Sequence, residues 1–89
     1  MTPRRIPHTV VFPFGYRVGV RQVSRAELRA MDDDDDTDDL DAWFDGDARV
    51  IYIDRSLPIR RRRYLLTHEL SHAWADWQHY CLDIGVARP

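Results

Sequence analysis

The stretch from Thr67 to His72 reads Thr-His-Glu-Leu-Ser-His, and its residue types and spacing suit metal-dependent hydrolysis. On a helix, His68 and His72 stand on one face about one turn apart, so their imidazole rings can converge on one zinc ion. Glu69 then lies beside the open position of the metal, where its carboxylate can take a proton from a bound water. The pattern therefore predicts one Zn²⁺ as the cofactor, His68 and His72 as ligands, and Glu69 as the catalytic base.

A third zinc ligand is needed, because hydrolytic zinc sites use three protein ligands and keep one position open. His79 lies further along the same predicted helix, and it could bind only if the helix broke before it, where no Gly or Pro occurs. Asp83 follows the expected helix end, just before Gly85, and could fold back on a turn. We therefore prefer Asp83 to His79, and a water, the C-terminal carboxylate, His8 or a partner protein are the other candidates.

Two further side chains are candidates for supporting roles. Asp76 cannot share the ion with His68, because a straight helix rises about 1.5 Å per residue and the aspartate side chain is short. Four residues after His72, it can instead accept the ring N–H of His72 that faces away from the metal, which would fix the tautomer. Tyr80, or else His79, could stabilise the oxyanion that develops on a substrate.

The motif requires a long helix, which we predict from about Leu57 to Gln78 or beyond, with Ser56 as its cap and Pro58 near its first turn. One stripe of this helix is apolar and should pack on a sheet; it comprises Ile59, Leu66, Leu70, Ala73, Trp74 and Trp77. The adjacent stripe comprises Leu65, His68, His72, Asp76 and His79. Packing gives no reason to place three histidines and an aspartate beside an apolar face, so the second stripe favours a site.

Three strands and a short helix are expected before the long helix. Tyr16 to Val23 alternates apolar and polar residues with the period of a half-buried strand, and Thr9 to Phe12 either pairs with it or packs as an extended arm. A Ser-Arg-Ala-Glu capping box predicts a helix over residues 25–31. Residues 42–45 and 49–53 form a predicted hairpin around an Asp-Gly turn. The second strand of this hairpin is almost continuously apolar, which indicates a central strand.

Length and composition predict one small cytosolic domain over residues 1–89. Cys81 is the only cysteine, which excludes an internal disulfide, and no apolar run is long enough for a signal peptide or a membrane span. The acidic run from Asp32 to Asp39 lacks the spacing of an EF-hand and is interpreted as a solvated loop. An electrostatic partner for the arginines further along the chain is the other possibility. Arg60 to Arg63 is interpreted as a salt-bridged helix surface, since no aromatic residues interleave it and the net charge of −2 argues against nucleic acid as a partner.

Residues 64–77 read Tyr-Leu-Leu-Thr-His-Glu-Leu-Ser-His-Ala-Trp-Ala-Asp-Trp and follow Arg-Val-Ile-Tyr-Ile-Asp and an Arg-rich helix start. This segment resembles the active-site half of the ImmA/IrrE-type metallopeptidases within the zincin class. More distantly, His-Glu-Leu-Ser-His-Ala-x-x-Asp is similar to the thermolysin-like gluzincins. The resemblance covers roughly residues 40–78, and more loosely 15–23. It implies that His68 and His72 bind zinc, that Glu69 is the general base and later the proton donor, and that Ala42, Trp43 and Phe44 form an edge that pairs with substrate.

We therefore expect a minimal zincin-like α+β domain, with a small twisted sheet packed on the long active-site helix and one short helix. The expected function is zinc-dependent hydrolysis of peptide bonds, and the resemblance implies an intracellular protein substrate, such as a transcriptional repressor. The alternative is a non-catalytic interaction domain that keeps zinc, or only the fold, for stability. This alternative is favoured by the very small size and by the incomplete set of zinc ligands. Gluzincins take their third ligand from a glutamate on a further helix, and this sequence does not match that helix.

Overall fold

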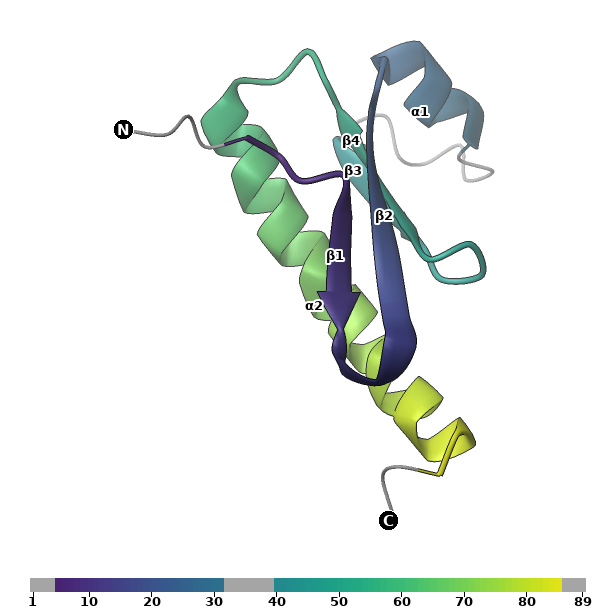
Figure 1. Ribbon diagram of the computed structural model, residues 1–89. Coiled ribbons are helices and arrows are strands. Elements are labelled where there is room, and N and C mark those ends of the chain that lie inside the picture. Colours follow the sequence, from purple (N-terminus) through teal and green to yellow (C-terminus); the bar gives the residue numbers. More distant parts are fainter. Residues whose placement is uncertain (1–4, 32–39, 86–89) are drawn as a thin grey trace.

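A computed structural model of the chain describes residues 5–31 and 40–85, and it confirms the expected α+β fold (Figure 1). The strands are β1 (Thr9–Phe12), β2 (Tyr16–Val23), β3 (Ala42–Asp45) and β4 (Val50–Asp54), and the helices are α1 (Arg25–Met31) and α2 (Ile59–Asp83), with a short 3₁₀ turn, η1 (Pro13–Gly15), between β1 and β2. The acidic run from Asp32 to Asp39 lies outside the described residues.

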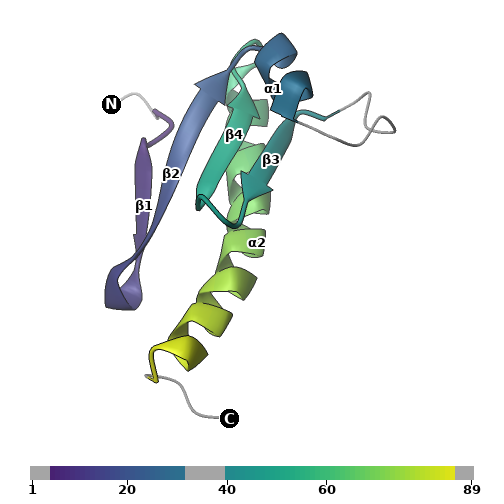
Figure 2. The ribbon, with the colours of Figure 1, turned by 90° about the vertical axis from the view of Figure 1, so that its right-hand side faces the viewer.

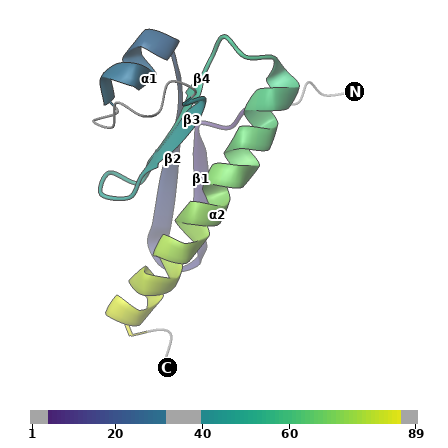
Figure 3. The ribbon, with the colours of Figure 1, turned by 180° about the vertical axis from the view of Figure 1, so that it is seen from behind.

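The four strands form one sheet in the order β1-β2-β4-β3 (Figure 2). β2 and β4 run parallel in the middle, and each pairs antiparallel with an outer strand, β1 and β3 respectively. The long helix α2 covers one face of this sheet, and α1 lies on the other side where β2 and β4 end (Figure 3). The core lies between α2 and the sheet; its buried members are Ile6, Tyr16, Val18, Val20, Ile51, Ile53, Leu65, Leu66 and Ala73.

β2 has the alternation that the sequence predicts. Tyr16, Val18 and Val20 are buried in the core beneath α2, whereas Arg17 and Arg21 are exposed on the opposite face. Thr9 to Phe12 was expected either to pair with this strand or to pack as an extended arm, and it pairs with β2. β1 adds to β2 with Thr9 opposite Gly19 and Phe12 opposite Tyr16.

The predicted hairpin is formed by β3 and β4, and β4 is a central strand as expected. Its Ile51 and Ile53 side chains are fully buried. The turn after β3 is stabilised by the side chain of Asp45, whose Oδ1 accepts the backbone N–H groups of Asp47 at 3.0 Å and Ala48 at 3.2 Å. An aspartate at the start of a turn commonly stabilises it in this way.

The helix start differs from expectation. Pro58 occupies the cap position of α2 without a side-chain hydrogen bond, and the Ser56 hydroxyl donates instead to Asp54 Oδ1 at 2.7 Å. A buried carboxylate attracts the hydroxyl more strongly than a solvated helix end does. The stripes on α2 are also shifted, because Leu65 is buried in the core, while Trp74 is 52% exposed.

Candidate metal site

The three side chains of the predicted motif converge on α2. Ligand atoms of His68, Glu69 and His72 all lie within 4.8 Å of one another. Glu69 Oε2 is 4.0 Å from His68 Nε2 and 3.8 Å from His72 Nε2. The two imidazole rings meet edge-on with their centroids 5.2 Å apart. The helix thus places both imidazole nitrogens and the carboxylate around one small volume.

Burial differs sharply within this cluster. The side chains of His68 and His72 are 56% and 57% exposed, whereas that of Glu69 is only 10% exposed. Within residues 5–31 and 40–85, no group donates a hydrogen bond to the Glu69 carboxylate, and its partners at ion-pair distance there are the two imidazoles. A shielded carboxylate requires a compensating positive charge or hydrogen bonds. Because imidazole nitrogens and a carboxylate oxygen are donors that zinc prefers, the residues present fit this metal.

An open hollow adjoins the cluster on the side of β3. It has a volume of about 260 Å³ and is lined by Trp43, Phe44, Glu69 and His72. β3 is an edge strand of the sheet and contacts α2 (Figure 2). The strand that the family resemblance implies to pair with substrate therefore lies next to the catalytic candidate Glu69.

The backbone direction in β3 follows from one hydrogen bond. Asp54 N donates to Asp41 O at 2.9 Å, so the backbone groups of Asp41 face β4. Backbone groups alternate in direction along a strand, and those of Ala42 and Phe44 consequently face away from β4, toward the open edge. Their side chains pack on the core, while Trp43 stacks on Tyr52 with ring centroids 5.7 Å apart.

The candidates for a third ligand are not brought to the cluster. α2 is continuous to Asp83, which places His79 about 10 Å and Asp83 about 16 Å beyond His72 along the helix axis. His8 lies near β1, at the other edge of the sheet, where it lines a different pocket. Without a break in the helix none of these side chains can reach the cluster, and the C-terminal carboxylate lies outside the described residues. The potential metal-binding group within the described ranges consists of His68, Glu69 and His72.

The two candidates for supporting roles have other partners. Asp76 Oδ2 accepts the hydroxyl of the fully buried Tyr16 at 2.6 Å, rather than an imidazole N–H. Burial, followed by this hydrogen bond, raises the pKa of Tyr16 well above its ordinary value. The Tyr80 hydroxyl donates to the carbonyl of Phe14 in the turn between β1 and β2, far from the histidine pair. The Tyr80 side chain therefore does not reach the cluster as an oxyanion stabiliser.

Replacing Asp76 with alanine should reduce the free energy of unfolding by about 1–3 kcal/mol, because the buried Tyr16 hydroxyl then loses its acceptor. Zinc affinity should change little. In the double variant with Tyr16→Phe, which also removes the hydroxyl, part of the stability should return. Urea unfolding of the wild type and these two variants, with zinc titration of each, measures the change in stability and the change in zinc affinity. A large loss of zinc affinity in Asp76→Ala would instead support the predicted contact with His72.

A neighbour of His68 was missed in the sequence. The ring of Tyr64 lies against the His68 ring with centroids 6.5 Å apart and planes 18° apart, and the Arg61 guanidinium stands 5.3 Å from the centre of the Tyr64 ring. This stack restricts the orientation of an otherwise exposed imidazole. The spacing of four residues between Tyr64 and His68 was the available signal, since side chains at this spacing are neighbours on a helix.

Comparison with known protein families, curated proteins and solved structures finds no match to this chain. Within residues 5–31 and 40–85, no helix is long and apolar enough to cross a bilayer. Function is therefore inferred from the side chains of the site and from the motif that they form.

Proposed function

We propose that this protein is a zinc-dependent metallopeptidase acting on an intracellular protein substrate, as the ImmA/IrrE-type resemblance implies. The observation that carries the proposal is the shielded Glu69 carboxylate, which faces His68 and His72 and opens onto a hollow beside an edge strand. This arrangement puts a proton acceptor, two metal ligands and a place for an extended peptide together. No other part of the described chain combines these three features.

Each side chain of the cluster has a defined task in this proposal. His68 and His72 would hold the metal through their Nε2 atoms. Bound zinc would supply Lewis acidity to a substrate carbonyl and to a water. Glu69 accepts a proton from the attacking water and then delivers it to the amine nitrogen of the leaving peptide.

The substrate would bind as an added strand along β3. The outward backbone groups of Ala42 and Phe44 can pair with an extended peptide, as sheet edges commonly do. Such a strand would pass the hollow lined by Trp43, Phe44, Glu69 and His72, which can receive one of its side chains. Backbone pairing gives affinity with little dependence on sequence, so the identity of the substrate is determined by few side chains.

A second candidate is the non-catalytic domain in which zinc is structural. It is favoured by the position of Glu69 Oε2, which is almost equally distant from the two Nε2 atoms at 4.0 and 3.8 Å. From there the carboxylate could itself be the third ligand. The carboxylate of Glu69 would then be a metal ligand rather than a base acting on a water, and the domain would bind its partner without cleaving it.

Zinc addition should raise the melting temperature of the wild-type protein and should have little effect on His68→Ala. Binding to the folded state alone stabilises by about 2.7 kcal/mol when zinc is present at about 100 times its dissociation constant. Calorimetry measures the melting temperature, and metal analysis measures the bound zinc. His79→Ala is the matched control, because it removes a histidine from the same side of α2. If His68→Ala keeps its zinc and its melting temperature, both zinc-based functions are wrong.

Catalysis is tested on the same preparations. An unfolded protein substrate should be cleaved by the zinc-loaded protein, spared after chelation, and cleaved again when zinc is restored. Zinc binding without cleavage of any unfolded substrate would favour the structural role of the metal.

A further inference from the structure

The edge of β2 is only partly covered by β1. The two strands pair from Tyr16 to Gly19, and one more hydrogen bond follows, from Val20 N to His8 O at 2.8 Å. Before His8 the chain turns away from β2 toward the start of α2 (Figure 1), and Ile6 is buried in the core. β2 itself continues to Val23, paired with β4 on its other side. Its last residues therefore form a second open edge in the sheet.

The direction of the backbone groups on this open edge follows from bonds to β4. Gly19 N donates to Arg49 O, and Val23 O accepts from Arg55 N, so these residues of β2 face β4. By alternation, the N–H and C=O of Gln22 face the uncovered side. Within residues 5–31 and 40–85, no strand pairs with them there. Unpaired groups of this kind are a template for a further extended chain.

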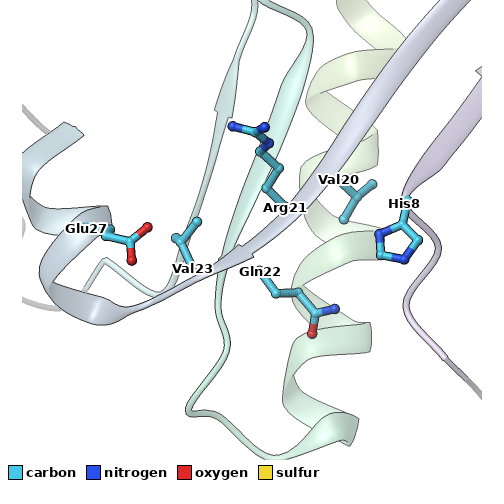
Figure 4. A pocket seen from close by; sticks show the side chains of 6 residues that line it. All are labelled: His8, Val20, Arg21, Gln22, Val23 and Glu27. Atoms are coloured by element: carbon cyan, nitrogen blue, oxygen red, sulfur yellow. The ribbon is translucent and has the colours of Figure 1, made fainter.

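A pocket of about 440 Å³ lies along this edge (Figure 4). It is lined by His8, Val20, Arg21, Gln22, Val23 and Glu27. Figure 4 shows Arg21 and Gln22 pointing to opposite sides of β2, with His8 beside β1 and Glu27 on α1. The pocket thus follows the strand for the length that β1 leaves uncovered, and it is larger than the hollow of about 260 Å³ beside Glu69.

Two arginines give this edge a positive character. Arg21 is exposed on the face opposite α2, and Arg62 Nη1 donates to Gln22 Oε1 on the face of α2. Neither guanidinium forms an ion pair with a carboxylate of residues 5–31 or 40–85. A strand added here would meet one cation on each of its faces. Glu27, on α1, would repel an acidic group placed at that end.

We propose that the open edge of β2 docks an extended acidic segment of a partner protein. The backbone of the segment pairs with Gln22, and carboxylates that alternate between its two faces approach Arg21 and Arg62. β2 and β3 lie in different parts of the sheet, with β4 between them, so this docking site is separate from the Glu69 cluster. The inference therefore does not depend on the proposed peptidase activity.

The test uses the full chain and a short fluorescein-labelled peptide in which pairs of adjacent aspartates alternate with pairs of valines, followed by fluorescence anisotropy. Adjacent aspartates of an extended strand point to its two opposite faces. This peptide should bind, with affinity falling as salt rises, and its counterpart with lysine in place of aspartate should not. Arg21→Glu should weaken binding about tenfold or more, because attraction becomes repulsion. Arg17→Glu is the matched control, being an exposed arginine of the same strand within the part that β1 covers. A backbone N-methylated aspartate peptide should lose binding.

Several outcomes would overturn the proposal. The proposal is wrong if the aspartate peptide does not bind, or if the lysine peptide binds equally well. It is also wrong if Arg17→Glu and Arg21→Glu lose the same amount of peptide affinity, or if N-methylation leaves binding intact. Self-association of the protein that Arg21→Glu abolishes would identify a second copy as the occupant instead. Glu69→Gln should bind the peptide like the wild type, so failure of the peptidase proposal and failure of this one are distinguishable.

Discussion

Replacing Glu69 with glutamine is expected to reduce peptide hydrolysis by about 10²- to 10⁴-fold while the protein keeps its zinc. Glutamine has nearly the same shape but cannot accept the proton of the attacking water. The neighbouring His68 and His72 are unchanged, so metal binding through their nitrogens should persist. Cleavage of an unfolded protein, measured together with metal content, gives both results on one preparation.

Glu27→Gln is the matched control, because Glu27 is the only other glutamate of the chain and is exposed on α1. It should leave both hydrolysis and zinc unchanged. If Glu69→Gln loses its zinc and the wild type cleaves no unfolded protein, Glu69 is a ligand and the non-catalytic domain is the better description. Unchanged hydrolysis in Glu69→Gln would show that the peptidase proposal is wrong.

Replacing Arg25 with methionine should lower the free energy of unfolding by more than replacing Arg29 does, because it leaves a buried carboxylate without its counter-charge. Asp54 is fully buried, and its Oδ2 lies 2.9 Å from Arg25 Nε. Apart from this guanidinium, that oxygen has no polar partner within the described residues, so Arg25 is its main compensation. The same guanidinium also bonds Asp41 at 2.7 Å. Urea unfolding near neutral pH measures the loss, with Arg29→Met, an exposed arginine of α1, as the control.

The size of this loss should depend on pH. Burial tends to raise the pKa of Asp54, but hydrogen bonds from Ser56 and the charge of Arg25 outweigh it and hold the pKa below its ordinary value. A lowered pKa in the folded state contributes stability above the unfolded value of about 3.9, and this stability is lost as the pH falls through the folded value. The difference between wild type and Arg25→Met should therefore shrink on acidification. A difference that is constant from neutral pH to below the folded pKa, or no larger than that of Arg29→Met, would contradict the assigned role of the ion pair.

Most of the fold could be predicted because local patterns and tertiary packing agree. The alternation in β2, the capping box before α1 and the apolar run of β4 each specify an element that the structure contains. The cap of α2 could not be predicted, because Ser56 bonds the buried Asp54, and that burial depends on how α1 and β4 come together. Pairing between β2 and β4 is likewise a tertiary property with no local signal.

The candidate site was predictable to the extent that one helix determines it. His68, Glu69 and His72 share a turn and a half of α2, so their spacing fixed their convergence. Asp76 was assigned to His72 by the same helical spacing, yet its partner is Tyr16, which lies 60 residues earlier in the chain. The position of a third ligand required knowing that α2 continues without a break to Asp83.

The parallel pairing of β2 with β4 brings together Gly19 and Val50, which are 31 residues apart along the chain (50 − 19). The β1–β2 and β3–β4 hairpins are local and can form early, whereas this central pairing must wait for a long loop to close. Closure of this loop should therefore be the slowest part of forming the sheet. The three residues of the candidate metal site all lie on α2, so their convergence depends on that one helix and not on this closure.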